Sequence, residues 1–528
     1  MRRVGIDVGG THTDAVLMQE GKLLAWSKVV TTPEVLEGIR TALRQVARQA
    51  GGGQVGLIAI GTTQLINALV ERRRLAKVAA VRLGLPSTRS LPPFVDWPED
   101  LLECVRLRVD MVEGGHEFDG REISPLDEAA LRRLGGELRD EASSPDGEGL
   151  ALAISAPFCL VDPSHEERAA SILQRLLPRA SITPSHIFGR MGLLERENAA
   201  LLNAALTPLA RSLLTGLERA VAEAGLHGPL FLTQNDATLM DLERASRFPV
   251  LTLSSGPTNS MRGAAWLTGL KDALVIDIGG TTTDVGLLQG GIPRESGTVI
   301  RLGGVRTHFR LPEVLSIGLG GGSVVTEEGG RVDVGPRSVG HRLEREALLF
   351  GGRTLTASDV AVALGRAAFG ELARVAHLDA ELLRRADATF HARLEDAIDR
   401  VKLARGDVPA VVVGGGSVLV GESLRGVHPL LRPEHAQIAN AIGAAMAQVG
   451  GEVDQIFELS RLSRDEALHQ ARSTAIAHAV AAGAAPEGVE VVELEELPLA
   501  YLRGNAMRIR AKAVGELSRT GGEAHVAG

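Results

Sequence analysis

One eleven-residue motif occurs twice in this chain of 528 residues, and it limits the possible folds more than any other feature. Residues 7–17 read DVGGTHTDAVL and residues 277–287 read DIGGTTTDVGL. Each copy follows an apolar segment and combines a strand, a glycine turn and a second strand, which predicts a β-hairpin. A motif repeated at this distance indicates two duplicated lobes, each opening with its own hairpin.

The residue types in the turn are suited to binding phosphate. Paired glycines let the backbone approach a ligand closely, and their N–H groups together with threonine hydroxyls donate hydrogen bonds to anionic oxygens. We therefore expect phosphate contacts from Gly9, Gly10, Thr11, Thr13, Gly279, Gly280, Thr281, Thr282 and Thr283. A pair of purely structural Gly-Thr hairpins is the alternative interpretation.

The carboxylates before the glycines, Asp7 and Asp277, would repel a bare phosphate. Mg²⁺ removes this conflict, because it keeps its waters and bridges carboxylates to nucleotide phosphates. We expect Asp7 and Asp277 to organise Mg²⁺, and Asp7, Asp14 and Asp277 are the candidate catalytic carboxylates. The sequence does not separate the base from the metal-organising residue.

A third glycine turn predicts an adenosine contact. Residues 409–420, PAVVVGGGSVLV, read as a buried strand that ends in Gly414, Gly415, Gly416 and Ser417. The glycine run at 318–323 is a second candidate, whereas 51–56 precedes a strand and reads as a helix C-cap and loop. Two hairpins followed by this strand resemble the actin, hexokinase and heat-shock-70 superfamily, which implies an α/β fold of two ribonuclease-H-like lobes with ATP between them.

Composition and charge narrow the function classes. The length requires two or more domains, the net charge is −8, and aromatic residues make up 3% of the chain, which argues against nucleic-acid binding. Two separate cysteines, Cys104 and Cys159, do not make a zinc site of the usual kind. Because the N-terminus lacks a signal peptide and the longest apolar run is short, we expect a cytoplasmic protein without membrane contact.

Segment composition gives a domain prediction. We expect a first lobe at 1–270 with an inserted subdomain at about 85–148, a second ATPase lobe at 271–450, and C-terminal helices and closing strands at 451–528 that end in a frayed tail. Three single histidines, His186, His308 and His341, are further candidates for a hydrolytic site, although single histidines more often serve the core or the surface.

The ordered motifs together resemble the hydantoinase A / 5-oxoprolinase family, over residues 1 to about 450. They comprise the two hairpins, GTTQLINALVERR from residue 61, Glu195 to Asn198, Ser255 to Pro257, the glycine turn at 320–323 and Val-Gly-Pro at 334–336. His12 stands where many members have an aromatic residue, and the segment after 336 lacks the usual glycine-proline-alanine-cysteine run. The chain resembles the short branch of that family.

The resemblance implies an ATP-dependent hydrolase that opens a cyclic amide, such as a hydantoin or 5-oxoproline, by phosphorylating the amide oxygen. It also implies a B-type partner subunit, and hence a homo- or hetero-oligomer. Candidate substrate contacts are Thr62, Thr63, Asn67, Ser255 and Gly256. A small-molecule kinase of the same superfamily and an ATP-driven reactivating chaperone for another enzyme are the alternatives.

Overall fold

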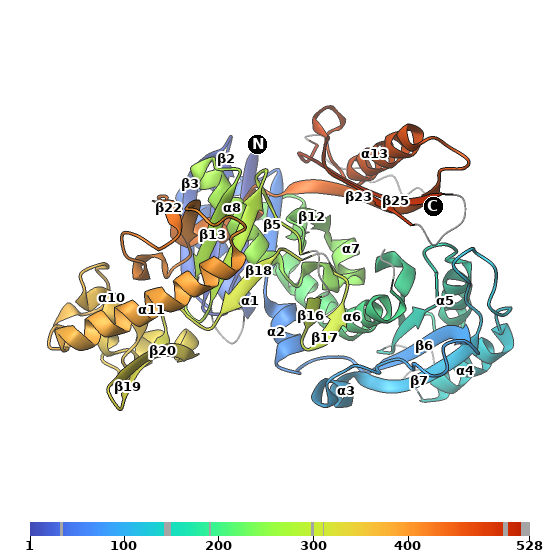
Figure 1. The fold of residues 1–528 in the computed structure, drawn as a ribbon, viewed down its shortest axis with the longest axis horizontal. Coiled ribbons are helices and arrows are strands. Elements are labelled where there is room, and N and C mark those ends of the chain that lie inside the picture. Colours follow the sequence, from blue (N-terminus) through green and yellow to red (C-terminus); the bar gives the residue numbers. More distant parts are fainter. Residues whose placement is uncertain are drawn as a thin grey trace.

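The structure is a computed structural model that describes residues 1–31, 35–141, 149–188, 192–296, 300–309, 311–499 and 505–518. Its strands form two large sheets and a separate four-stranded sheet, together with several two-stranded ribbons (Figure 1).

The first lobe is built on a mixed sheet. Its strands run in the order β3-β2-β1-β5-β11-β12, with β1 antiparallel to β2 and parallel to β5, and β5 parallel to β11. These strands are β1 (Arg2–Val8), β2 (His12–Gln19), β3 (Lys22–Val30), β5 (Leu57–Thr62), β11 (Leu230–Thr233) and β12 (Thr238–Asp241). Helices α1 (Val35–Ala50) and α6 (Leu193–Glu223) bury their apolar sides against one face of this sheet.

The second lobe repeats this arrangement. Its order is β18-β14-β13-β21-β22, with β13 antiparallel to β14 and parallel to β21. The strands are β13 (Ala273–Ile278), β14 (Thr283–Gln289), β15 (Ile292–Pro293), β18 (Val314–Ile317), β21 (Val408–Val413) and β22 (Val427–Leu431). Two hairpin-led sheets of the same order and direction confirm the two ribonuclease-H-like lobes expected from the repeated motif.

Two helices lie between the lobe sheets. Helix α8 (Ser255–Thr268) packs on β13 and β14 of the second lobe, and α12 (Ala439–Ala445) packs on β1 and β2 of the first. The helices cross so closely that a methyl group added at Gly263 would overlap the backbone of Ala439, and one at Gly443 would overlap that of Asn259. Only glycine permits this approach of two helix backbones.

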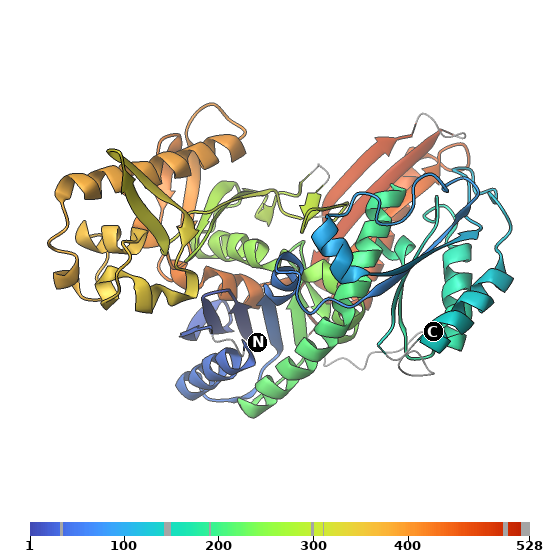
Figure 2. The same ribbon diagram turned by 90° about the horizontal axis from the view of Figure 1, so that it is seen from below.

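The region from 78 to 184 has its own parallel sheet, in the order β7-β6-β8-β9. Helix α6 and α3 (Glu99–Val105) cover one face, and α4 (Glu128–Glu141) and α5 (Ser164–Leu176) cover the other. The strands are β6 (Val78–Leu85), β7 (Arg106–Glu113), β8 (Ala151–Ser155) and β9 (Ser181–Pro184). The expected insertion at 85–148 is bracketed by β6 and β8. These two strands pair with each other and not with the sheet of the first lobe (Figure 2).

The C-terminal strands extend the first lobe's sheet beyond β12, in the order β23-β25-β24. They are β23 (Gln448–Glu458), β24 (Glu490–Pro498) and β25 (Ala506–Gly515), and α13 (Arg464–Ala481) packs on them through alanines four residues apart. Helix α12 before them is short and built of small residues, and β23 begins at Gln448 soon after it.

The remaining elements decorate the lobes. The second lobe carries an outer layer of β19 (Ser323–Glu328), β20 (Arg331–Ser338), α9 (Leu343–Glu346), α10 (Ala357–Ala363) and α11 (Ala380–Val401), and a ribbon of β16 (Ile300–Leu302) and β17 (Val305–Thr307). Short elements of the first lobe are β4 (Gly53–Gln54), α2 (Gln64–Val70), β10 (Leu226–His227) and α7 (Leu242–Arg247). Residues Pro249–Thr252 form a 3₁₀ turn.

Helix α6 is long and apolar enough to cross a membrane by length and composition, but 61% of its most apolar stretch is buried inside the protein. Its apolar side chains pack between the first lobe and the four-stranded sheet, which accounts for their number. The longest apolar run of the sequence, at 151–161, is a core strand and its following turn.

Candidate functional site

The two glycine hairpins have the same backbone arrangement. Asp7 lies opposite Asp14 in the first hairpin, and Asp277 lies opposite Asp284 in the second. The turns close with the same hydrogen bond, from Gly9 N to His12 O at 3.0 Å and from Gly279 N to Thr282 O at 2.9 Å. The repeat in the sequence is therefore a repeat in local structure.

The tips of the two hairpins face each other across the lobes. A methyl group added at Gly280 would lie 3.1 Å from Thr11 Cγ2, so the second turn touches the first. Backbone donors and hydroxyls from both lobes thus meet at this contact. Backbone N–H groups gathered in this way are suited to binding the oxygens of a polyphosphate.

Asn440 on α12 connects the aspartates of the two lobes. Its amide Nδ2 donates to Asp7 Oδ2 at 3.3 Å, and the same side chain lowers the pKa of Asp277. Burial and the neighbouring Asp14 nevertheless raise the pKa of Asp7 to about 7, and burial also raises the pKa of Asp277. The pair is a concentrated negative site that favours a cation or a proton.

Mg²⁺ fits the residues at this position. Asp7 Oδ1 is buried and has no hydrogen-bond partner among the described residues, and Asp277 is one of the groups that raise its pKa. Mg²⁺ usually keeps several waters and is bound through one or two carboxylates, and an unpaired carboxylate oxygen beside a second carboxylate meets this requirement. Asp7 and Asp277 are accordingly the residues that would hold the metal.

Lys28, which the sequence interpretation missed, lies within the same cluster. Its Nζ donates to both oxygens of Asp14, at 2.9 and 2.8 Å, and to the backbone oxygen of Gln437 at 3.1 Å. Lys28 stands opposite Asp14 in the register of β2 and β3. Burial and the nearby Lys28 lower the pKa of His12 to about 4, so this histidine is neutral at physiological pH.

The glycine turn after β21 lies directly against the second hairpin. Gly416 N donates to Ile278 O at 2.7 Å, and any side chain at Gly414 would overlap the carboxylate of Asp277. Gly415 approaches Lys28, and Ser417 starts a 3₁₀ turn. Turn 414–417 therefore joins the two hairpins at one place.

The other glycine run, 318–323, packs behind the second hairpin. Gly321 N donates to Gly279 O at 3.0 Å and Gly322 N donates to Gly280 O at 2.7 Å. A side chain at Gly320 would collide with that hairpin's backbone. This run supports the shape of the second turn. The run at 51–56 follows the end of α1 with Gly51 in the left-handed region, as expected for a C-cap.

The candidate substrate residues gather beside the first hairpin. Thr62 pairs with Val8 at the end of β1, and Thr63 Oγ1 donates to Val8 O at 3.1 Å. Asn67 Nδ2 reaches Thr63 Oγ1 at 3.5 Å, and a methyl group added at Gly256 in the first turn of α8 would lie 3.6 Å from Thr63 Cγ2. Ser255 begins α8, and its buried Oγ has no partner among the described residues. A helix N-terminus with a free hydroxyl favours an anionic or carbonyl oxygen.

The three candidate histidines lie apart and do not form one site. His186 donates its backbone N–H to Glu166 at 2.8 Å and also contacts this carboxylate through its ring. His308 lies near Glu195, and His341 is exposed in the 3₁₀ turn at 340–342. Cys159 is buried, and burial raises the pKa of its thiol to about 12, which makes it inert.

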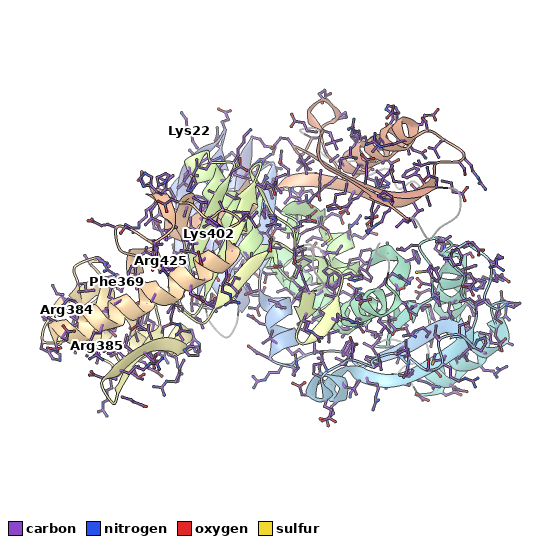
Figure 3. All side chains as sticks on the ribbon, viewed as in Figure 1. Lys22, Phe369, Arg384, Arg385, Lys402 and Arg425 are labelled. Carbon is purple, nitrogen blue, oxygen red and sulfur yellow. The ribbon has the colours of Figure 1, made fainter. Side chains whose placement is uncertain are left out.

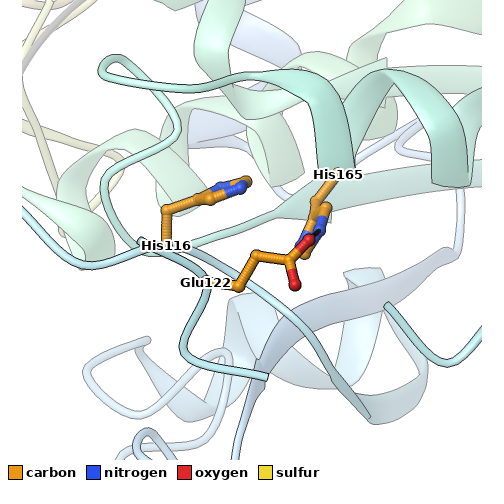
Figure 4. Close-up of side chains that lie close together, drawn as sticks. All are labelled: His116, Glu122 and His165. Atoms are coloured by element: carbon orange, nitrogen blue, oxygen red, sulfur yellow. Dashed lines mark hydrogen bonds and ion pairs between the residues drawn. The ribbon is translucent and has the colours of Figure 1, made fainter. Parts of the chain in front are cut away.

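A different cluster, His116, Glu122 and His165, brings three possible metal ligands together at the end of β7 (Figure 4). Gly115 N donates to His165 Nδ1 at 2.9 Å, so the ring's proton resides on Nε2, which faces Glu122 Oε1 at 3.2 Å. A protonated ring nitrogen cannot bind a metal. In this geometry the cluster fastens the loop after β7 instead.

Comparison with known proteins gives consistent matches. Residues 3–177 match the hydantoinase/oxoprolinase N-terminal region, and residues 196–402 match the hydantoinase/oxoprolinase model. Caprolactamase subunit alpha of Pseudomonas jessenii is 28% identical over 409 residues, covering 70% of this chain and 55% of that protein. Acetophenone carboxylase gamma subunit of Aromatoleum aromaticum is 26% identical over 408 residues, covering 69% of this chain and 53% of that protein.

Among solved structures, the ATP-dependent caprolactamase of Pseudomonas jessenii superposes with a TM-score of 0.75 at 21% identity, over 98% of this chain and 88% of that one. This likeness supports the fold. The chain spans about half the length of the two relatives that it matches in sequence.

Proposed function

The chain belongs to the hydantoinase/oxoprolinase family, and on that premise we propose that it uses ATP to activate and open a cyclic amide. The observation that carries the proposal is the meeting of two identical Gly-Gly-Thr hairpins over a pair of linked aspartates, Asp7 and Asp277. The name of the caprolactamase relative supports a lactam as the substrate type.

The reaction divides into three balanced steps. The amide oxygen attacks the γ-phosphorus, the bond to the β-phosphate oxygen breaks, and ADP leaves. One water then adds to the activated carbon and the ring C–N bond breaks, which leaves a free amine and an acyl phosphate. A second water hydrolyses the acyl phosphate to the carboxylic acid and phosphate. The sum consumes ATP and two waters and releases the amino acid, ADP and phosphate. Phosphoryl transfer of this kind requires positioning and charge neutralisation above all.

The residues of the chain supply that positioning. The turns at 9–13 and 279–283 hold the β- and γ-phosphates through backbone N–H groups and hydroxyls, and turn 414–417 holds the adenosine. Asp7 and Asp277 would hold Mg²⁺, which neutralises phosphate charge when bound. Lys28 offsets the carboxylates, being bonded to Asp14.

The substrate side of the site is the corner formed by Thr63, Asn67 and the first turn of α8. Ser255 Oγ, which is buried without a partner among the described residues, and the backbone N–H groups of this turn would hold the carbonyl oxygen of the amide beside the γ-phosphate. The described residues contain no separate nucleophile–base pair near this corner. We therefore propose that ring opening uses water, together with a partner subunit, as the names of the two subunit relatives suggest.

The test is ADP release on adding hydantoin, 5-oxoproline and lactams of five to seven ring atoms, with and without a B-type subunit. Free phosphate and the ring-opened acid should appear in equal amounts by ³¹P and ¹H NMR. A persistent phosphoester would identify a small-molecule kinase instead. Release stimulated only by acetophenone with bicarbonate would assign the chain to ketone carboxylation, and tight nucleotide-dependent binding to another enzyme without turnover would indicate a chaperone.

A further inference from the structure

The four-stranded sheet has an order that creates a binding crevice. Strand β6 connects to β7 on one side, and the chain then crosses to β8 on the other side, so the order β7-β6-β8-β9 reverses direction between β6 and β8. All of its strand pairs are parallel. In open parallel sheets of this type, ligands bind outside the carboxyl ends of the strands at the point where the order reverses.

A cavity of about 380 Å³ lies at that point. Ser87 and Thr88 follow β6, Phe158 and Leu160 follow β8, and Arg196 comes from the first turn of α6. Cavities of roughly 300 Å³ and more are typical of small-molecule sites. Ile456 of β23 also lines the space, so the C-terminal strands help to enclose it.

Two features mark this cavity as a built site. Phe158 has a φ of 46°, in the left-handed region that bulky side chains avoid, and such strain concentrates at functional positions. Arg196 is 3% exposed and fixed, because its Nε donates to Ser185 Oγ at 3.1 Å, its Nη1 to Gly192 O at 3.4 Å and its Nη2 to Ala156 O at 2.6 Å. Its guanidinium thus places a fixed positive charge at the cavity wall, near the buried carboxylate of Glu166, and such a charge favours a carbonyl or carboxylate oxygen.

The loop after β7 closes the cavity on one side and is itself held in place. His165 receives the N–H of Gly115 and faces Glu122, and Ile123 N donates to Gly115 O at 2.9 Å. This places Ile123 and Glu117 at the cavity wall. The remaining walls formed by described residues are mostly apolar, with one arginine, one glutamate and two hydroxyl groups as their polar members.

We infer that this cavity is a second small-molecule site, separate from the hairpin site, for a compact apolar molecule that carries one carbonyl or carboxylate group. Within the proposed function, on which this assignment of the ligand rests, that chemistry describes a cyclic amide or its ring-opened amino acid. The apolar walls would cover the methylene groups and Arg196 would face the oxygen. Glu117 would face an ammonium group only in the ring-opened form.

The wall of this cavity also touches the β16–β17 ribbon, whose apolar side chains pack in the core around α6. A side chain at Gly192, just before α6, would overlap His308, which follows β17. Glu195 lies 3.2 Å from Arg306 in β17.

The experiment uses the full chain and saturation-transfer NMR with ε-caprolactam, 5-oxoproline, hydantoin and 6-aminohexanoate as probes. Val161 lines the cavity and is 40% exposed, so Val161→Trp fills the space without disturbing the core. Leu403→Trp, at a position that is 69% exposed on the second lobe, is the matched control. We expect Val161→Trp to weaken probe binding at least about tenfold, while the control and the affinity for Mg-ATP stay unchanged.

The variant Glu117→Gln distinguishes the cyclic amide from the ring-opened amino acid as the ligand. It should weaken binding of 6-aminohexanoate several-fold and leave the lactams unchanged. Equal binding by wild type and Val161→Trp would overturn the inference, and so would the absence of saturation transfer for every probe. Because binding is measured without ATP, these outcomes are independent of ADP release, which tests the proposed function by itself.

Discussion

The two hairpins have the same backbone, but they differ in the residue opposite their second aspartate. In the first lobe, Asp14 pairs with Lys28 on β3. In the second lobe, the equivalent Asp284 pairs with Ser316 on β18, whose hydroxyl donates to it. The two hairpins share their backbone arrangement but differ in charge, because the first has a lysine beside its second aspartate and the second has a serine.

The two halves of the site therefore have the same backbone geometry but differ in the charge beside their second aspartate. Burial raises the pKa of both Asp14 and Asp284, the latter to about 6. The charge and hydrogen bonds of Lys28 oppose this rise at Asp14, whereas at Asp284 only the hydroxyl of Ser316 opposes it. The four predictions below either remove this asymmetry or measure it.

The largest effect is expected where the lobes are alike. Asp7→Ala and Asp277→Ala should each lower ATP turnover by more than about 100-fold, because each removes one of the two linked carboxylates. Steady-state ADP release measures the loss, with Asp333→Ala on β20 as the control. If one variant keeps wild-type turnover, the hairpins do not act as a pair.

The stability of the nucleotide-free protein should reveal the cost of this carboxylate pair. The pKa of Asp7 is about 7 in the fold against an ordinary value of 3.8, so the folded state binds more protons between pH 4 and 7. The free energy of unfolding therefore decreases as the pH rises from 4 to 7, because the folded state gives up the proton that it holds on Asp7. Asp7→Asn should be more stable than wild type at pH 8, by on the order of 2 kcal/mol, and equal to it at pH 4. Denaturant unfolding at both pH values checks this, and an equal difference at both would contradict it.

Lys28→Ser makes the first hairpin resemble the second. We expect kcat/KM for Mg-ATP to fall by roughly tenfold, since one charge-assisted contact is lost while both metal-holding aspartates remain. Lys22→Ser is the control, because Lys22 lies exposed at the outer end of the same strand (Figure 3). Lys28→Arg should recover part of the loss. Equal values for Lys28→Ser and wild type would show that the asymmetry has no role in nucleotide use.

Ser316→Lys makes the second hairpin resemble the first, and it should have the smallest effect. The new ammonium should lower the pKa of Asp284 by about one unit and change ATP turnover less than about threefold. NMR titration of the Asp284 carboxyl measures the shift, and Ser316→Ala, which should raise that pKa, is the control of opposite sign. A shift in the same direction for both variants would contradict the pairing.

The sequence predicts the lobes well because their signal is local. The repeated motif specifies both turns, and the apolar run before Gly414 specifies a central strand, so each feature is contained in about a dozen residues. The roles of Asn440 and Lys28 cannot be predicted from such local patterns. Asn440 meets Asp7 across 433 positions, and Lys28 reads as one charged residue in an alternating strand. Only tertiary pairing gives these two residues a role.

The four-stranded sheet shows a related limit. Strands at 78–85 and 151–155 are apolar and could pair with the first lobe equally well by composition. In the fold they pair with each other, with β7 and with β9, and α4 and α5 cover one face of the sheet that results. Pattern alone therefore identifies the strands and leaves their sheet undecided.

The glycine contacts between α8 and α12 have a mechanical consequence. Where two backbones touch without side chains between them, neither helix can slide or separate without losing that contact, but each can turn about the crossing point. Any rotation of one lobe against the other therefore has its axis near Gly263 and Gly443. Points close to an axis travel least, so Asn440 and the two aspartates it links are nearly stationary. The outer strands β19 and β20 lie farther from this axis and would move more. A fluorophore attached there would therefore report lobe rotation that a fluorophore beside Asp7 would not.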